Sequence, residues 1–180
     1  MEAAFITNIS FPKSLDEVLY FIDVRGHFDV EEVLEESYVE WTAPKDAHIG
    51  EQVFFMHSKT SIDTIRSLKK QRKEMEAHIS PDANKTLIEA LDKAEKLYQS
   101  IGGCVFARGK VCGEIIVDNV ARSDGLHWRS VYYAPIGDIS VIEPPINISE
   151  FRDFIKISRT GAITKLDERQ EKMLLSLRGL

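Results

Sequence analysis

A histidine and a serine, His57 and Ser58, stand at the end of an apolar run in the segment GEQVFFMHSKTS (residues 50–61). An imidazole beside a hydroxyl can act as a general base and a nucleophile. Adjacent residues of a strand point to opposite faces, however, so this pair is poorly placed to share a proton. Two interpretations stay open: the pair closes an ordinary core strand, or it stands at the rim of a pocket.

No other pattern in the sequence matches a catalytic or metal-binding template. The chain lacks a phosphate-binding P-loop, a G-x-G-x-x-G turn, a G-x-S-x-G nucleophile elbow and an H-E-x-x-H helix. Its five histidines and two cysteines show no spacing typical of metal ligands. We therefore predict no catalytic residue, no metal and no cofactor, and a binding function is favoured over an enzyme.

Aromatic side chains in or beside the predicted strands are the more informative class. Alternation places Phe55 and His57 on one face of a strand at 52–57 and Met56 on the other. Small barrels fill their own cores with such rings. The same rings can instead leave a slot for a nucleobase, which offers a stackable face and a hydrogen-bonding edge. The candidate residues of a base-binding pocket are Trp41, Phe55, His57, Ser58, Trp128, Tyr132, Arg159 and Thr160.

The net charge of −6 argues against a nucleic-acid partner, because phosphate binding usually needs a basic surface. Its distribution is uneven: residues 1–58 hold 12 acidic and 3 basic side chains, whereas residues 59–180 hold 17 and 20. Bases gather just after Ser58, in a predicted helix that is either an ordinary solvated face or a phosphate-contacting one. The candidate phosphate contacts are Lys59, Arg66, Lys69, Lys70 and Lys73.

Periodicity and turn residues predict the elements that must position these side chains. We expect strands at 3–9, 37–42, 52–57, 104–107, 111–117, 128–134 and 162–164, with residues 108–110 dividing two of them. Helices are expected after Ser14, at 30–36, at 60–78, from Ser80-Pro81 to 101, from Ser149 and after Asp167, with Pro135, Pro144 and Pro145 in loops. The predicted class is α+β: a curved, barrel-like β-sheet flanked by helices, with a helical hairpin inserted at about 59–101.

Length and composition predict the domain organisation and the cellular location. The 180 residues, 43% hydrophobic and 29% charged, are typical of one folded domain over 1–180. No apolar run approaches the roughly 18 residues that a membrane span needs, and the N-terminus lacks a secretory pattern. Cys104 and Cys112 are too far apart on an extended strand for a disulfide. We expect free thiols, a cytoplasmic location and no membrane partner.

An ordered series of motifs resembles the EVE domain family, whose PUA-like fold is related to the YTH and ASCH domains. The segment IGEQVFFMHS (49–58) is similar to one family strand, ARGKVCGEIIVD (107–118) to the next, and WRSVYY (128–133) to the one that follows. EPPINISEFRDFI (143–155) and SRTGAITKLDERQEKMLLSL (158–177) resemble the segments that complete the domain. The matches run in family order, interrupted by the predicted hairpin.

The resemblance implies a fold and a partner. The fold is a PUA-like, EVE-like curved or closed β-barrel flanked by helices. Its aromatic-lined pocket would accept a modified nucleobase of DNA or RNA, so that the protein would be a nucleic-acid-binding reader. The residues on or near the family's pocket positions are Trp41, His57, Ser58, Trp128 and Arg159.

Two alternatives to a reader stay open. ASCH domains include hydrolases of modified nucleosides that use Lys, Thr and Glu, and the candidates here are Lys59, Thr60 and Glu114. The other alternative is a protein-interaction module. The apolar face of the helix at 81–100 must pack on something, either the first helix of the hairpin or a partner, and a homodimer would satisfy it.

Overall fold

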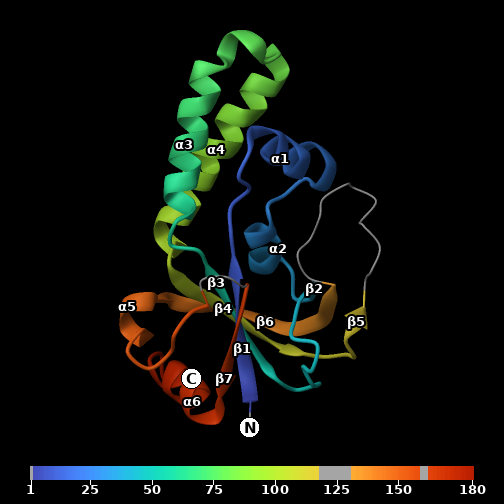
Figure 1. Cartoon of the computed structure of the whole chain (residues 1–180), viewed down its shortest axis with the longest axis vertical. Coiled ribbons are helices and arrows are strands. Elements are labelled where there is room, and N and C mark those ends of the chain that lie inside the picture. Colours follow the sequence, from blue (N-terminus) through green and yellow to red (C-terminus); the bar gives the residue numbers. More distant parts are fainter. Residues whose placement is uncertain (1, 118–130, 159–161) are drawn as a thin grey trace.

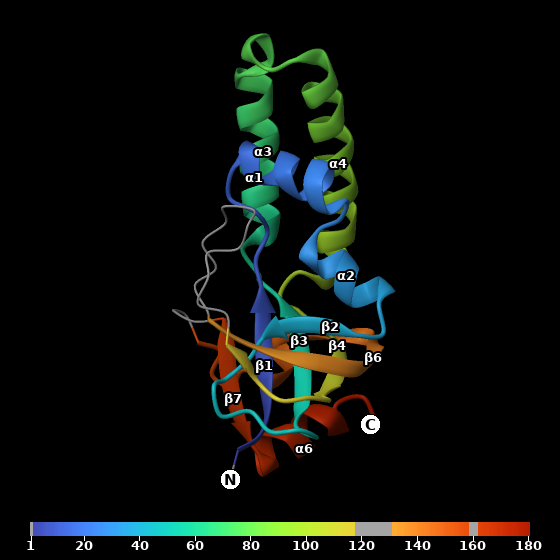
Figure 2. The ribbon, with the colours of Figure 1, turned by 90° about the vertical axis from the view of Figure 1, so that its right-hand side faces the viewer.

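A curled mixed β-sheet forms the centre of the protein (Figures 1 and 2). The computed structural model describes residues 2–117, 131–158 and 162–180. In these ranges the strands are β1 (Glu2–Ile9), β2 (Val39–Thr42), β3 (Gln52–His57), β4 (Cys104–Val111), β5 (Ile116–Val117), β6 (Tyr132–Asn147) and β7 (Ile163–Asp167). They follow the order β2-β6-β4-β3-β1-β7, with β5 paired to β6, and the sheet curls into a half-barrel. Strands β1 and β3 are parallel, and the other pairs are antiparallel.

Helices flank the sheet, and one pair extends beyond it. The described helices are α1 (Leu15–Tyr20), a π-helical turn (Phe21–Arg25), α2 (Asp29–Glu35), α3 (Ser61–Glu74), a 3-10 turn (Glu76–His78), α4 (Pro81–Ile101), α5 (Ile148–Phe151) and α6 (Glu168–Ser176). In Figure 1, α3 and α4 form a hairpin that rises away from the sheet, and both termini lie toward the opposite end. The predicted α+β class, curved sheet and helical hairpin are confirmed.

Alternation along the strands gives the sheet two apolar faces. Val53 and Phe55 of β3 belong to the larger core, which includes side chains of α1, α2, α3 and α4. Phe54 and Met56 belong to a smaller core that includes side chains of α5 and α6. All four side chains are at most 2% exposed. The two-faced pattern predicted for residues 52–57 is therefore confirmed.

The hairpin is held on the sheet by the apolar face of α4. Helix α4 contacts α3, α1 and β4. The buried members of this face are Leu87, Ala90, Leu91, Ala94, Tyr98 and Ile101. Tyr98 also lies edge-on to Phe11, with ring centroids 5.3 Å apart. The sequence left open what covers the apolar face of this helix. In the structure, other elements of the same chain cover it.

Side-chain caps begin three helices as the sequence predicts. The Ser14 hydroxyl accepts a hydrogen bond from the Glu17 amide at 3.1 Å, and Ser80 plays the same part at the start of α4. The Asp167 carboxylate accepts the amide of Gln170 at 2.8 Å, and the Gln170 side chain accepts the Asp167 amide at 3.0 Å. These bonds satisfy amides that have no intrahelical acceptor.

Strand β4 corrects one prediction. The sequence predicts two strands divided at residues 108–110, but β4 runs unbroken to Val111. Gly109 lies where β6 approaches closely: a Cβ atom there would stand 2.9 Å from the carbonyl oxygen of Gly137. This glycine therefore marks a close backbone contact inside the sheet and not a turn.

Strand β6 corrects a second prediction, which placed three prolines in loops. Pro135, Pro144 and Pro145 predict loops, but β6 passes through all three. Pro144 and Pro145 fall where the pairing of β6 with β4 shifts register, opposite the step from Val105 to Ala107. Proline lacks an amide donor, and a register shift leaves positions where none is needed. The carbonyl of Pro135 accepts a backbone amide at 2.9 Å, so this residue joins the sheet as an acceptor.

The prediction of free thiols is confirmed. Cys104 and Cys112 are free thiols, the first buried and the second exposed. No helix in the described ranges is both long enough and apolar enough to cross a membrane.

Candidate functional site

The indole of Trp41 is held in a fixed orientation inside the curl of the sheet. Trp41 Nε1 of β2 donates a hydrogen bond to Thr7 Oγ1 of β1 at 3.0 Å, and Figure 2 shows these two strands. The indole also meets the ring of Phe55 edge-on, with centroids 5.7 Å apart and planes at 85°. Thr7 and Phe55 are completely buried, whereas Trp41 is only partly buried. The indole is therefore held by two contacts within the chain, and Trp41 as a residue is accessible in part to solvent.

Strands β2 and β7 are the two ends of the strand order, and side chains bridge the open side between them. Trp41 of β2 reaches Thr7 of β1, which is the neighbour of β7. Asp46, which follows β2, accepts two hydrogen bonds from Lys165 Nζ of β7, at 2.9 and 3.0 Å. Lys165 holds the pKa of the Asp46 carboxyl below its usual value. We call the line closed by these two contacts the seam.

His57 lies in the core and not at a rim. Its ring is 0% exposed and stands edge-on to the ring of Tyr98, with centroids 3.9 Å apart. Nδ1 lies 3.2 Å from the carbonyl oxygen of Ser58, and among the described residues Nε2 has no hydrogen-bond partner. Burial lowers the pKa of His57 to about 3, against the opposing effect of the Ser58 carbonyl. The imidazole is therefore neutral at physiological pH, and its environment is that of a core residue.

The other predicted pocket residues are distributed around the fold. The Ser58 hydroxyl lies 3.0 Å from that of Thr60, at the start of α3, and Tyr132 begins β6. Trp128, Arg159 and Thr160 lie outside the described residues. The structure thus brings Trp41 and Phe55 into contact, and it places His57 two residues further along the same strand, under the hairpin.

Thr7 is the residue of this site that the sequence analysis missed. It lies between Phe5 and Ile9 on the face of β1 that belongs to the larger core. A hydroxyl on such a face must find a hydrogen-bond partner, because an unsatisfied buried polar group is costly. That rule could have marked Thr7 as a site residue, although not its pairing with Trp41.

Most of the predicted phosphate-contacting cations are already paired with carboxylates. Lys69 Nζ lies 2.7 Å from an oxygen of Asp92 and 2.6 Å from one of Glu95, and these hydrogen bonds raise the pKa of Lys69. Arg66 also approaches Glu95, at 3.6 Å, and Lys70 lies at 4.0 Å from a carboxylate one turn on. Much of the basic face of α3 is therefore neutralised within the hairpin.

Two of the five candidates keep an uncompensated charge. Lys59 and Lys73 are exposed, and neither forms an ion pair with a described residue. The candidates for a hydrolytic site are not assembled either: no hydrogen bond or ion pair in the described part of the chain joins Glu114 to Lys59 or Thr60. In the described ranges, no three His, Cys, Asp or Glu side chains are grouped so that they could hold a metal ion.

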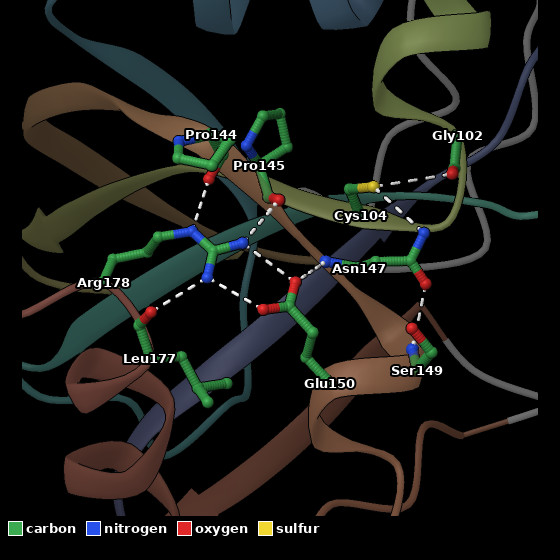
Figure 3. A network of polar contacts seen from close by, with 9 residues as sticks. All are labelled: Gly102, Cys104, Pro144, Pro145, Asn147, Ser149, Glu150, Leu177 and Arg178. Carbon is green, nitrogen blue, oxygen red and sulfur yellow. Dashed lines mark hydrogen bonds and ion pairs between the residues drawn. The ribbon is translucent and has the colours of Figure 1, made fainter.

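A second polar network ties the C-terminal end to the sheet (Figure 3). The Arg178 guanidinium donates to both carboxylate oxygens of Glu150, at 2.9 and 2.8 Å, and to the carbonyls of Pro144 and Pro145 at 2.7 and 2.9 Å. The amide of Asn147 donates to the Glu150 carboxylate at 2.9 Å. Asn147 Oδ1 accepts the Ser149 amide at 3.0 Å, so Asn147 caps α5, where the sequence predicts Ser149. Because its donors are engaged within the chain, we assign this network a structural role.

Replacing Arg178 by alanine should lower the free energy of unfolding by about 1–2 kcal/mol, because hydrogen bonds that involve a charged group contribute about that much when partly exposed. Urea unfolding followed by circular dichroism measures the change. Arg152→Ala is the matched control, since Arg152 is exposed on the same α5 side of the sheet. Equal losses in the two variants would show that the network adds no stability of its own.

Comparisons with known proteins leave the family of the chain open: no protein-family model matches the sequence, and no curated protein matches it at the threshold applied.

Proposed function

We propose that the protein is a nucleic-acid-binding reader that holds one modified base of DNA or RNA against Trp41 at the seam. The half-barrel would then be a PUA-like fold of the EVE type, as the ordered motifs suggest. The observation that carries the proposal is the orientation of a partly exposed indole by Thr7 and Phe55 at the open side of the sheet.

A fixed indole suits base recognition for two reasons. Stacking of a base on an aromatic side chain contributes about 1–3 kcal/mol and needs only a free ring face. In the closed sheet the Trp41 N–H is satisfied by Thr7, so the indole is held in one defined orientation before a ligand arrives. Extruding a base from a duplex costs a few kcal/mol, which is comparable to the free energy gained by stacking. An unpaired base is therefore the favoured ligand.

The charges suggest that phosphate contacts contribute little. Among the five cationic candidates, only Lys59 and Lys73 lack a carboxylate partner in the described residues. Each neutralised phosphate of a single strand contributes a slope of about −0.7 in a plot of log affinity against log salt. Two contacts would give a slope of about −1.4, so affinity should depend on the base more than on the backbone.

The test is filter binding of single-stranded oligonucleotides at two salt concentrations. Plain, methylated, hydroxymethylated and glucosylated oligonucleotides are compared for the wild type and for Trp41→Ala. We expect preference for one modified oligonucleotide and a loss of about 5- to 150-fold in that affinity for Trp41→Ala, the equivalent of one stacked base.

Tyr38→Ala is the control for this test, because Tyr38 is an aromatic residue that is 51% exposed three positions before Trp41. It should bind like the wild type. Absence of binding to every oligonucleotide at low salt would overturn the proposed function, and so would an unchanged affinity of Trp41→Ala.

A further inference from the structure

The seam differs from the other lines of contact in the half-barrel. Neighbouring strands such as β3 and β4, or β1 and β3, are joined by backbone ladders of several residue pairs each. In the described part of the chain, β2 pairs only with β6 and β7 only with β1, so no ladder joins β2 to β7. Side-chain contacts close this line instead: Trp41 on Thr7, and Asp46 on Lys165.

These contacts are easier to break than a ladder. The side chains of Lys165 and Asp46 are 40% and 55% exposed, and exposed ion pairs are weak and screened by salt. The Trp41 bond is a single neutral hydrogen bond. A ladder is broken only by losing several backbone bonds together. Among the described residues, the seam is therefore closed by weaker contacts than those of the backbone ladders.

Burial shows why opening matters for a ligand. Thr7 and Phe55, which hold the inner side of the indole, are completely buried. A base can reach this inner side only if β2 moves away from β1 and β7. Without that movement the base meets no more than the outer part of the Trp41 ring.

We propose that the seam is the entrance of the base site: the Asp46–Lys165 pair and the Trp41–Thr7 bond separate to admit one uncharged ring. This inference rests on the proposed function. The exposed side chains around β2 carry a net negative charge, because Glu35, Glu36, Glu40 and Asp46 outnumber Lys45 and Lys165, and this charge disfavours phosphate. The phosphate backbone then stays outside while the base enters.

The experiment locks the seam with a removable cross-link. Asp46→Cys and Lys165→Cys are combined with Cys112→Ser, which removes the exposed native thiol. A short bifunctional maleimide with a reducible centre joins the two new cysteines. The control carries the same link at Lys85→Cys and Glu89→Cys, an exposed i,i+4 pair on α4 that lies outside the seam and outside the candidate phosphate contacts. The oligonucleotide panel described above is the probe.

We expect the locked seam to lower the affinity for the preferred modified oligonucleotide at least 10-fold, toward that for the plain one, and reduction to restore it. The control link should change neither affinity. Equal binding by the locked and reduced forms would overturn the inference while leaving the proposed function standing.

Amide hydrogen exchange supplies a readout that needs no ligand. If the seam opens, the locked form should exchange amides of β2 and β7 at least several-fold more slowly than the reduced form, with α3 unchanged. Exchange that is unaffected by the link would overturn the inference, whatever the oligonucleotides do. Slower exchange without binding of any oligonucleotide would support the movement of the seam, but it would overturn the proposed function and with it the assignment of the seam as the entrance of a base site.

Discussion

Truncating Tyr98 to alanine should lower the free energy of unfolding by about 3–5 kcal/mol, the range found for removal of a large aromatic side chain from a core. Tyr98 is 1% exposed and lies between the hairpin and the sheet. Its ring meets Phe11 and His57 edge-on, at centroid distances of 5.3 and 3.9 Å. Alanine would leave a cavity that these packed rings could fill only in part. Guanidinium unfolding followed by circular dichroism measures the loss.

The same experiment tests whether the hairpin and the sheet form a single domain, as predicted for residues 1–180. If they unfold together, Tyr98→Ala should shift one cooperative transition detected equally by helical and aromatic signals. Tyr38→Ala, at a site that is 51% exposed, should change stability by no more than about 0.5 kcal/mol. Two separate transitions in the wild type, with only one affected by Tyr98→Ala, would contradict the single-domain prediction.

Local patterns predicted much of the fold because each has its cause within a few residues. The face of Phe55 follows from strand alternation, and the starts at Ser14 and Asp167 follow from caps that satisfy amides three residues on. The misplaced strands have causes that are distant in sequence. Gly109 sits in a strand because of where Gly137 passes, and Pro144 is tolerated because of a register shift with β4.

In the candidate site, too, local features could be predicted from sequence, whereas contacts between distant residues could not. Trp41 and Phe55 could each be assigned to a face of its own strand from sequence, but their contact depends on how far the sheet curls. The position of His57 under Tyr98 could not be foreseen, because the helix that covers it begins 24 residues later, at Pro81. The pairing of Lys69 with Glu95 likewise depends on the register between α3 and α4.

His57 should make the protein lose stability in mild acid. Its pKa is lowered by burial from 6.5 to about 3, so between these values the unfolded chain binds a proton that the folded chain does not. The contribution of His57 to the free energy of unfolding is therefore fully present above pH 6.5. It decreases by about 1.4 kcal/mol per pH unit as the pH falls from 6.5 toward 3. At pH 5 the loss relative to pH 7 should be about 2 kcal/mol.

The measurement is urea unfolding of the wild type and of His57→Phe at pH 7 and pH 5. Phenylalanine does not titrate, and any cost of its larger ring is the same at both pH values, so the variant should lose about 2 kcal/mol less than the wild type between them. The carboxyl groups of Asp46, Asp92, Glu95 and Glu150 have lowered pKa values and therefore weaken the fold mainly below pH 5. His78→Phe, at an exposed position of the hairpin tip, should keep the wild-type difference. If His57→Phe also loses as much free energy of unfolding between pH 7 and pH 5 as the wild type does, the imidazole is hydrated or paired in the folded protein. Its burial then does not govern the acid response.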